Sequence, residues 1–376
     1  MKRIEKAPSK EAGASARIPN PRTRWGEFLL GLRENSPVSS LMFLLVCTGW
    51  FTGAIALGTP SALRKGSVDD WTLDARDETG RLSAWIARMP TSQSGEQSVV
   101  LLGASDFREL SRDEDTLARM LQGQVQHPIK VFPLFCDALS MEMRLMVVEA
   151  IAEHQGVILV GINQRQMYRP VARARQLVGN LASRMAMEAP ESERWLRELG
   201  FPIPRRTGLF AFDHRDFFLP RLRHLAAPSK AAAAFDPQVS RPGKVIDRAW
   251  ILRLLSPEDS SAFERNVEML RRMAELVRLR GRSELILVQI PGVHDVAPWA
   301  SDPQFMAGSA AFEHKMRETA QALGISWISF HKECGLEASH FADPWHVTNA
   351  EAEERFSREL ISRISQRIRD RIHSAP

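Results

Sequence analysis

The amino-acid sequence predicts an α/β protein in which helices cover both faces of an open, mostly parallel β-sheet, giving three layers. Two observations lead to this prediction. Short, continuous apolar segments, some of them ending on glycine, alternate with longer segments whose apolar residues recur at helical spacing. A strand buried on both faces is apolar throughout, and strands that alternate with helices form parallel sheets through crossover connections.

The composition agrees with one large domain plus appendages. Of the 376 residues, 44% are hydrophobic and 25% are charged, which is ordinary for a chain that buries a core. The net charge of +5 is modest and no basic stripe is interleaved with aromatic residues, so we expect no nucleic-acid partner. Cys47, Cys136 and Cys334 have no metal-ligand spacing, and we expect no metal and no cofactor. A disulfide between Cys136 and Cys334 is left open by the sequence.

The first 60 residues have the pattern of a membrane anchor behind a basic tail. Residues 1–37 carry an excess of Lys and Arg and are expected to be a disordered cytoplasmic tail. No charge occurs between Glu34 and Arg64, and residues 38–60 are long enough to cross the ~30 Å hydrocarbon core as a transmembrane helix. The basic tail favours a single pass through the inner (cytoplasmic) membrane with the domain in the periplasm, outside the cytoplasm. A cleaved signal peptide and a buried core helix are the alternatives.

A polar connector, residues 61–97, with one expected helix at 71–88, precedes the globular domain at residues 98–376. Strands are expected at the apolar runs 98–103, 129–135, 156–161, 284–291 and 325–330. Helices are expected around 117–121 and at 140–154, 257–280, 310–323 and 349–371. A large helical insertion, residues 165–256, interrupts this alternation. The insertion either shapes an acceptor groove or is a structural cap, and its notable side chains are Trp195, Arg205, Arg206, Phe217 and Phe218.

The first motif with chemical potential is LLGASDF, at the end of the first expected strand. Ser105 follows Gly103 at the carboxyl end of that strand, where open α/β sheets build their sites. At the start of the next helix, its hydroxyl would lie in the field of free N–H groups, which favours an alkoxide or oxyanion. The alternative is that Ser105 only caps the helix.

The second motif is FADPWHVTNAE, before the last expected helix. Asp343 and His346 are close enough for the carboxylate to hold the imidazole, as the base of a serine nucleophile requires. Thr348 and Glu351 have capping-box spacing, so the helix should begin just after His346. In one alternative Asp343 bonds its own backbone before a proline, and in another His340 joins the pair as a metal site.

The third motif is VGINQRQ, after a middle strand. Asn163 lies at the same edge of the predicted sheet as Ser105, where its amide could donate a hydrogen bond to a developing oxyanion. The alternative is an ordinary turn residue. A single asparagine after a strand does not separate these two interpretations.

The order of the three motifs resembles the SGNH/GDSL hydrolase superfamily. Gly-x-Ser follows the first strand, Gly-x-Asn a middle strand, and Asp-x-x-His precedes the last helix, over roughly residues 98–164 and 285–371. The resemblance implies a flavodoxin-like sheet with Ser105 as nucleophile, His346 as general base and Asp343 as its orienting partner. It also implies an oxyanion hole formed by Asn163 and the backbone N–H of Ser105.

The chain departs from the family pattern in two places. Gly-Ala-Ser-Asp replaces the usual Gly-Asp-Ser context. The second family block, which normally supplies an oxyanion glycine, falls near residues 135–140, and FCDALS contains no glycine. The backbone N–H of Ala138 or Asp137 is therefore the candidate for the remaining donor.

An N-terminal anchor joined to this domain is similar to D-alanyl-lipoteichoic acid biosynthesis proteins and polysaccharide O-acetylation accessory proteins. The resemblance implies a serine esterase or O-acyltransferase that uses an acyl-serine intermediate on a cell-envelope polysaccharide or polymer. Its partners would be an acylated donor, the glycan acceptor and a membrane-bound O-acyltransferase. The rival class is a non-catalytic anchored protein that keeps the fold and binds a glycan or such a partner, and the missing glycine favours this rival.

Overall fold

The structure is a computed structural model, in which the chain forms two compact units, Met1–Ala54 and Ile55–Pro376. The residues it describes are 41–45, 48–49, 52–53, 58–65, 67–74, 77–89, 97–226, 249, 252, 260–280, 282–293, 301–330, 334–347 and 349–374. The predicted tail and part of the predicted span lie outside these residues. Within them, no helix combines the length and the apolar character that crossing a membrane requires.

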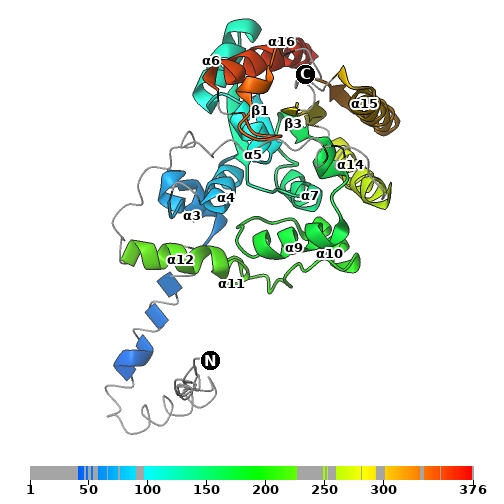
Figure 1. Cartoon of the computed structure of the whole chain (residues 1–376). Coiled ribbons are helices and arrows are strands. Elements are labelled where there is room, and N and C mark those ends of the chain that lie inside the picture. Colours follow the sequence, from blue (N-terminus) through cyan, green and yellow to red (C-terminus); the bar gives the residue numbers. More distant parts are fainter. Residues whose placement is uncertain are drawn as a thin grey trace, which may run out of the picture. The chain divides into compact units, whose positions relative to one another are not determined.

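The second unit contains a five-stranded sheet in which all strands are parallel, as predicted (Figure 1). The strand order is β2-β1-β3-β4-β5, and the strands are β1 (Ser98–Gly103), β2 (Lys130–Phe135), β3 (Gly156–Ile162), β4 (Ser283–Gln289) and β5 (Ser326–Ile328). The chain changes its winding direction between β1 and β3, where open α/β sheets leave a crevice at the carboxyl ends of the strands. Two of the expected site residues, Ser105 and Asn163, follow these two strands.

Two hydrophobic cores lie on opposite faces of the sheet and confirm the layered arrangement. Val100 and Leu102 of β1 pack with α4 (Glu78–Arg88), α7 (Met141–Ala150) and α14 (Ser260–Arg280). Val99 and Leu101 pack on the other face, with α6 (Glu114–Val125) and α16 (Ala350–Ser374). All residues of β1 are buried, which is why the strand reads as an unbroken apolar run.

Two helices begin elsewhere than the sequence suggested. The connector helix was expected from residue 71, but α4 begins at Glu78, where the Asp77 carboxylate caps it by accepting the N–H of Gly80. A helix expected from residue 310 begins seven residues earlier, because α15 (Pro303–Leu323) starts at Pro303 with Asp302 as its cap. Aspartate followed by proline is a strong signal for the start of a helix, and a prediction based on the spacing of apolar residues does not detect it.

The described part of the insertion is helical and packs on the connector. It comprises α8 (Gln164–Met167), α9 (Val171–Leu181), α10 (Pro190–Glu198), α11 (Phe210–Asp213) and α12 (Arg215–Ala226). Phe217 and Phe218 are buried with Leu63 of α3 (Pro60–Lys65), and Arg221 pairs with Asp77. Residues 227–248 of the insertion lie outside the described residues.

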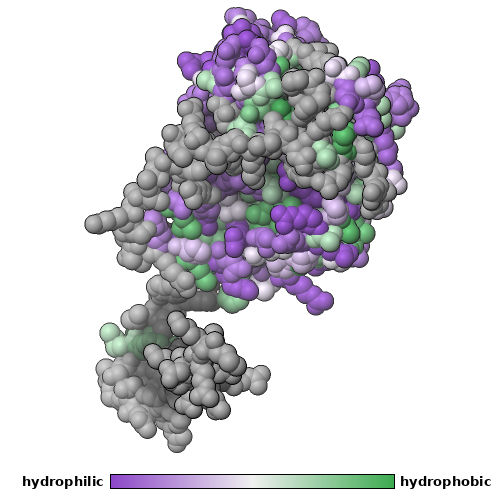
Figure 2. All heavy atoms as spheres, viewed as in Figure 1, coloured by the Kyte–Doolittle hydropathy of each residue, from purple (hydrophilic) through white to green (hydrophobic). Residues whose placement is uncertain are grey.

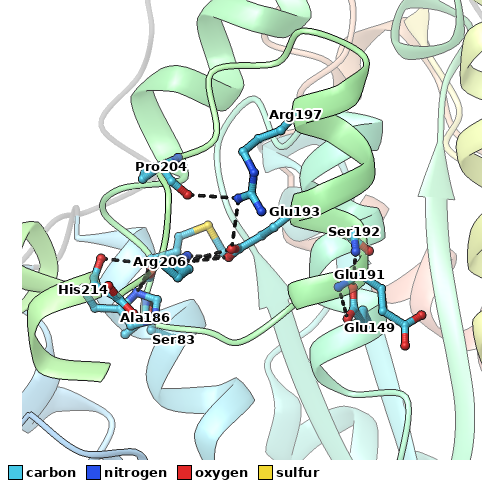
Figure 3. Close-up of polar contacts among 12 residues, drawn as sticks. Ser83, Glu149, Ala186, Glu191, Ser192, Glu193, Arg197, Pro204, Arg206 and His214 are labelled. Atoms are coloured by element: carbon cyan, nitrogen blue, oxygen red, sulfur yellow. Dashed lines mark hydrogen bonds and ion pairs between the residues drawn. The ribbon is translucent and has the colours of Figure 1, made fainter. Parts of the chain in front are cut away.

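Most of the insertion's notable side chains are structural. Arg206 Nε donates to both carboxylate oxygens of the buried Glu193 at 3.0 Å, and Arg206 Nη1 donates to the Asp213 carbonyl at 3.0 Å (Figure 3). The ring of Trp195 lies 4.8 Å below the Arg272 guanidinium of α14. These contacts favour the structural-cap interpretation over an acceptor groove. Arg205 alone among the five is exposed.

Candidate active site

Ser105 is positioned by a short helix that sits directly on the ends of two strands. This helix, α5 (Ser105–Leu110), begins two residues after β1 and is held by the buried ring of Phe107. A Cβ atom at Gly103 would lie 2.8 Å from Phe107 Cβ, and one at Gly161 of β3 would overlap the same ring. The two glycines therefore allow α5 to approach the carboxyl edge of the sheet.

Ser105 does not cap this helix. The capping position is occupied by Ala104, which makes no side-chain cap bond, and Ser105 is the first helical residue. Its Oγ instead lies 2.9 Å from His346 Nε2, a residue 241 positions away in the chain. The capping interpretation of Ser105 is thus wrong, and its half-buried hydroxyl is available for other chemistry.

His346 lies in a short loop that is fixed at both ends. Phe341 and Val347 form an antiparallel bridge across it, and the Ala342 N–H donates to the His346 carbonyl at 2.8 Å. The Val293 N–H, beyond the end of β4, donates to the Pro344 carbonyl at 2.9 Å. The loop is therefore tied to the carboxyl edge of the sheet, which brings His346 to Ser105.

Asp343 holds the imidazole and the loop at once. Its Oδ1 accepts the backbone N–H groups of Trp345 at 2.9 Å and His346 at 3.0 Å. His346 Nδ1 lies 2.8 Å from Asp343 Oδ1 and 2.7 Å from Oδ2. The backbone bonds expected from the alternative interpretation are thus present together with the bond to the imidazole.

The charge of Asp343 sets the protonation pattern of the pair. Burial raises the pKa of this carboxyl, but the hydrogen bonds from the His346 side chain and from the backbone outweigh burial and hold the pKa at about 2. The carboxylate is therefore ionised at neutral pH and accepts a hydrogen bond from the Nδ1–H group of His346. This places the lone pair of the neutral imidazole on Nε2, facing the Ser105 hydroxyl. Such an arrangement prepares a serine for nucleophilic attack.

Asn163 caps the helix that follows β3, as the turn interpretation expected, and its oxyanion role stays a prediction. As the cap of α8, its Oδ1 accepts the Gln166 N–H at 2.8 Å, and its own N–H donates to Gln166 Oε1 at 3.4 Å. Its Nδ2 donates to the carboxylate of Asp106. An amide nitrogen carries two hydrogens, so one N–H of Asn163 has no acceptor among the described residues.

The loop after β2 supplies a further donor. Ala138 has φ 57°, the left-handed conformation that favours glycine, at the place where the family pattern has a glycine. The Asp137 N–H donates to the Glu78 carboxylate, which removes it from the candidates. The backbone N–H groups of Ala138 and Ser105 donate to no acceptor within the described residues. Together with Asn163 these are the three oxyanion donors predicted from the sequence, and their catalytic role stays a prediction.

Two buried charged residues near the site were not singled out by the sequence. Asp106 Oδ2 accepts the Gln166 Nε2 hydrogen at 3.0 Å as well as that of Asn163, so it joins α5 to α8. Arg144 of α7 is fully buried and donates through Nη1 to the Gly161 carbonyl. Burial lowers its pKa to about 10 against the attraction of Asp106. The signal in the sequence that could have singled out Arg144 is its position within the mostly apolar run MEMRLMVV.

The metal and disulfide alternatives find no support in the described residues. His340 Nδ1 accepts the Glu337 N–H at 3.0 Å, which closes the turn η5 (Ala338–His340). No group of His, Cys, Asp and Glu in the described part of the chain could hold a metal ion. Cys136 and Cys334 are buried in cores on opposite faces of the sheet and form no disulfide with each other. Burial and the nearby Glu78 raise the pKa of the Cys136 thiol, which is therefore unreactive.

No protein-family model matches the chain, and no curated protein is significantly similar to it. The family resemblance therefore depends on the order of the motifs and on the geometry of the site. Both support the function that is proposed below.

Proposed function

We propose that the chain is a serine-dependent esterase or O-acyltransferase of the SGNH type. The observation that carries the proposal is the hydrogen-bonded series Ser105–His346–Asp343, assembled at the carboxyl edge of the sheet from distant parts of the chain. Neither Ser105 nor His346 belongs to a hydrophobic core, so packing does not account for their contact. A nucleophile, a base and an orienting carboxylate in this order match the requirements of acyl transfer.

The proposed reaction has two steps. The Ser105 Oγ attacks an ester or thioester carbonyl while its proton passes to His346 Nε2, and Asp343 stabilises the imidazolium that forms. The oxyanion accepts hydrogen bonds from the backbone of Ser105 and Ala138 and from Asn163 Nδ2. The leaving alcohol or thiol takes the proton from His346, which leaves an acyl-serine ester. A sugar hydroxyl or water then attacks this ester, with His346 again accepting and returning the proton.

The proposed setting is the outer face of the cytoplasmic membrane. It is supported by the charge-free residues 38–60 behind a basic tail and by the helical residues Leu41–Leu45, whose side chains are 42–63% exposed. The acceptor would be a cell-envelope polysaccharide or polymer, and a membrane-bound O-acyltransferase would supply the acyl group. Reporter fusions after residue 376 test the orientation, because an alkaline phosphatase fusion would be active only outside the cytoplasm.

A second candidate is a non-catalytic anchored protein that binds a glycan or a membrane-bound partner. The alanine at position 138 is the observation that favours it, because an L side chain in the left-handed region makes this donor loop less free to adjust. Burst kinetics separate the two candidates.

The experiment mixes the full-length protein with p-nitrophenyl acetate and follows p-nitrophenolate release. The proposal predicts a burst of about one equivalent as Ser105 is acylated, followed by slower turnover. Ser105→Ala should abolish the burst and His346→Ala should slow it at least a hundredfold, a typical contribution of a general base. His314→Ala is the matched control, because this imidazole is 73% exposed and lies on α15. A full-rate burst in Ser105→Ala, or no burst in the wild type, overturns the proposal.

A further inference from the structure

A run of arginines begins at Arg165, two residues after Asn163. The 24 residues 164–187 contain no Asp and no Glu and five arginines, Arg165, Arg169, Arg173, Arg175 and Arg184. The run covers α8 and α9, which leave the carboxyl end of β3 beside the candidate active site. In Figure 2 the area of α9 and α10 shows hydrophilic residues interspersed with hydrophobic ones.

Arg169 ties this run to the proposed oxyanion hole. Its Nη1 donates to the carbonyl of Ala138 at 3.3 Å, in the loop whose N–H group is a candidate donor. Burial lowers the pKa of Arg169 to about 10, and the nearby positive charges of Arg165 and Arg173 act in the same direction. The three guanidinium groups are therefore close enough to repel one another, and they lie next to the site.

Two buried carboxylates, Asp106 and Glu142, offset part of the positive charge of Arg169. Asp106 accepts from Asn163 and Gln166, and Glu142 lies 3.2 Å from Arg265. The exposed side chains of Arg165 and Arg173 form no ion pair with any described residue. The β3 side of the site therefore carries more positive charge than Asp106 and Glu142, the two carboxylates that act on Arg169, can balance.

The other side of the site is different. Arg108 of α5 pairs with Glu78, and its Nη2 lies 3.3 Å from an Asp137 carboxylate oxygen. Its charge is thus balanced within the protein. A surplus on one side only would orient a charged ligand, because the summed charges of a surface set the potential that the ligand meets.

We infer that Arg165, Arg169 and Arg173 form a binding surface for an anionic acceptor polymer, and that it aligns the polymer with Ser105. The inference rests on the proposed function and adds a substrate class to it: a chain carrying carboxylates or phosphates. Guanidinium groups suit both, because their planar fork can donate two parallel hydrogen bonds to either group. An anionic chain held along α8 and α9 presents its hydroxyl groups to the acyl-serine at the end of β1.

The test measures binding by the full-length protein, by calorimetry at low salt. Polygalacturonate presents carboxylates, inorganic polyphosphate presents phosphates, and dextran is a neutral control. One of the polyanions should bind and dextran should not, and the affinity should fall as salt rises to 0.5 M. Preference for one polyanion identifies which anionic group the surface takes.

Arg165→Gln/Arg173→Gln should weaken binding about tenfold, the effect of losing two charge-assisted contacts at an exposed surface. Arg119→Gln/Arg317→Gln removes the same charge from exposed positions on α6 and α15 and should change the affinity less than twofold. Equal binding by the two double variants overturns the inference, as does the absence of polyanion binding. Tighter binding to duplex DNA or to phosphatidylglycerol vesicles than to either polymer also overturns it.

Failure of the inference and failure of the proposed function are distinguishable. If Ser105 shows no acylation while the polyanion binds and the arginine variant weakens it, the arginine surface stands and the enzyme proposal falls. If Ser105 is acylated but no polyanion binds, only the inference about the acceptor falls.

Discussion

Replacing Asp343 with asparagine removes a charge from the candidate site while preserving its shape. Asparagine keeps an oxygen that can accept the backbone N–H groups of Trp345 and His346, which both point to Asp343 Oδ1. It also leaves an acceptor within reach of His346 Nδ1, now 2.8 Å from Oδ1. The variant therefore removes the charge that stabilises the imidazolium, and its Nδ2–H group, in the place of Oδ2 2.7 Å from His346 Nδ1, also favours the tautomer with the proton on Nε2.

The expected magnitude follows from the pKa of this carboxyl. Its fall from 3.8 to about 2 corresponds to about 2 kcal/mol at ~1.36 kcal/mol per pKa unit, or roughly 30-fold in rate. Part of this comes from the two backbone N–H bonds, which asparagine retains. We therefore expect a loss of at least about 10-fold from the missing charge, and up to about 10⁴-fold where the tautomer also changes, in the rate at which a fluorophosphonate probe labels Ser105.

The assay is the second-order rate constant of labelling at pH 8, measured with a circular-dichroism melt to verify folding. Asp370→Asn is the control, because Asp370 is exposed near the end of α16 and contacts Gln366 rather than the site. A folded Asp343→Asn protein that is labelled within threefold of the wild-type rate would refute the role of Asp343 in orienting and charging the pair.

Three further predictions concern stability. Because the folded pKa of Asp343 lies below its unfolded value, its stabilisation is present above about pH 5 and is lost as pH falls toward 2, so acid titration should destabilise the wild type more than Asp343→Asn. Ala138→Gly should leave the free energy of unfolding unchanged or raise it by up to about 1 kcal/mol, because φ of Ala138 is 57°, a conformation that favours glycine. Urea denaturation measures this free energy, and a loss above about 1 kcal/mol would contradict the described loop. Gly161→Ala should cost about 1–3 kcal/mol because its Cβ would overlap the ring of Phe107. The control Gly123→Ala, on a helix with no atom near the new Cβ, should stabilise by about 0.5–1 kcal/mol, and equal effects of the two would contradict the packing of α5.

The sheet could be predicted because its strands are buried on both faces. The runs that end at Gly103 and Gly161 are apolar without interruption, and only a parallel sheet covered twice requires this. The helix start at Pro303 was missed because the signal there is a cap and a proline, not an apolar period. Capping by Thr348 lies outside the described residues. In the described structure the Asn349 side chain accepts the Glu351 N–H at 2.7 Å at the start of α16.

The site was predictable in its members but not in its contacts. Ser105 was as well suited to capping as to catalysis, and the outcome depends on His346, which reaches it only through tertiary structure. In the sequence, Asp106 was only a departure from the family pattern. In the structure its carboxylate accepts a hydrogen bond from the Asn163 amide, across the crevice between the ends of β1 and β3. No local pattern contains this bond, because it joins the ends of two strands that are adjacent only once the sheet has formed.

The most direct test of the central claim is to treat the folded full-length protein with a fluorophosphonate probe and map the adduct by peptide mass spectrometry. The account predicts a single adduct, on Ser105, formed at least a hundredfold more slowly in His346→Ala, since the imidazole supplies the base. An adduct on another serine, no adduct at all, or labelling of Ser105 that is unaffected by His346→Ala would contradict it.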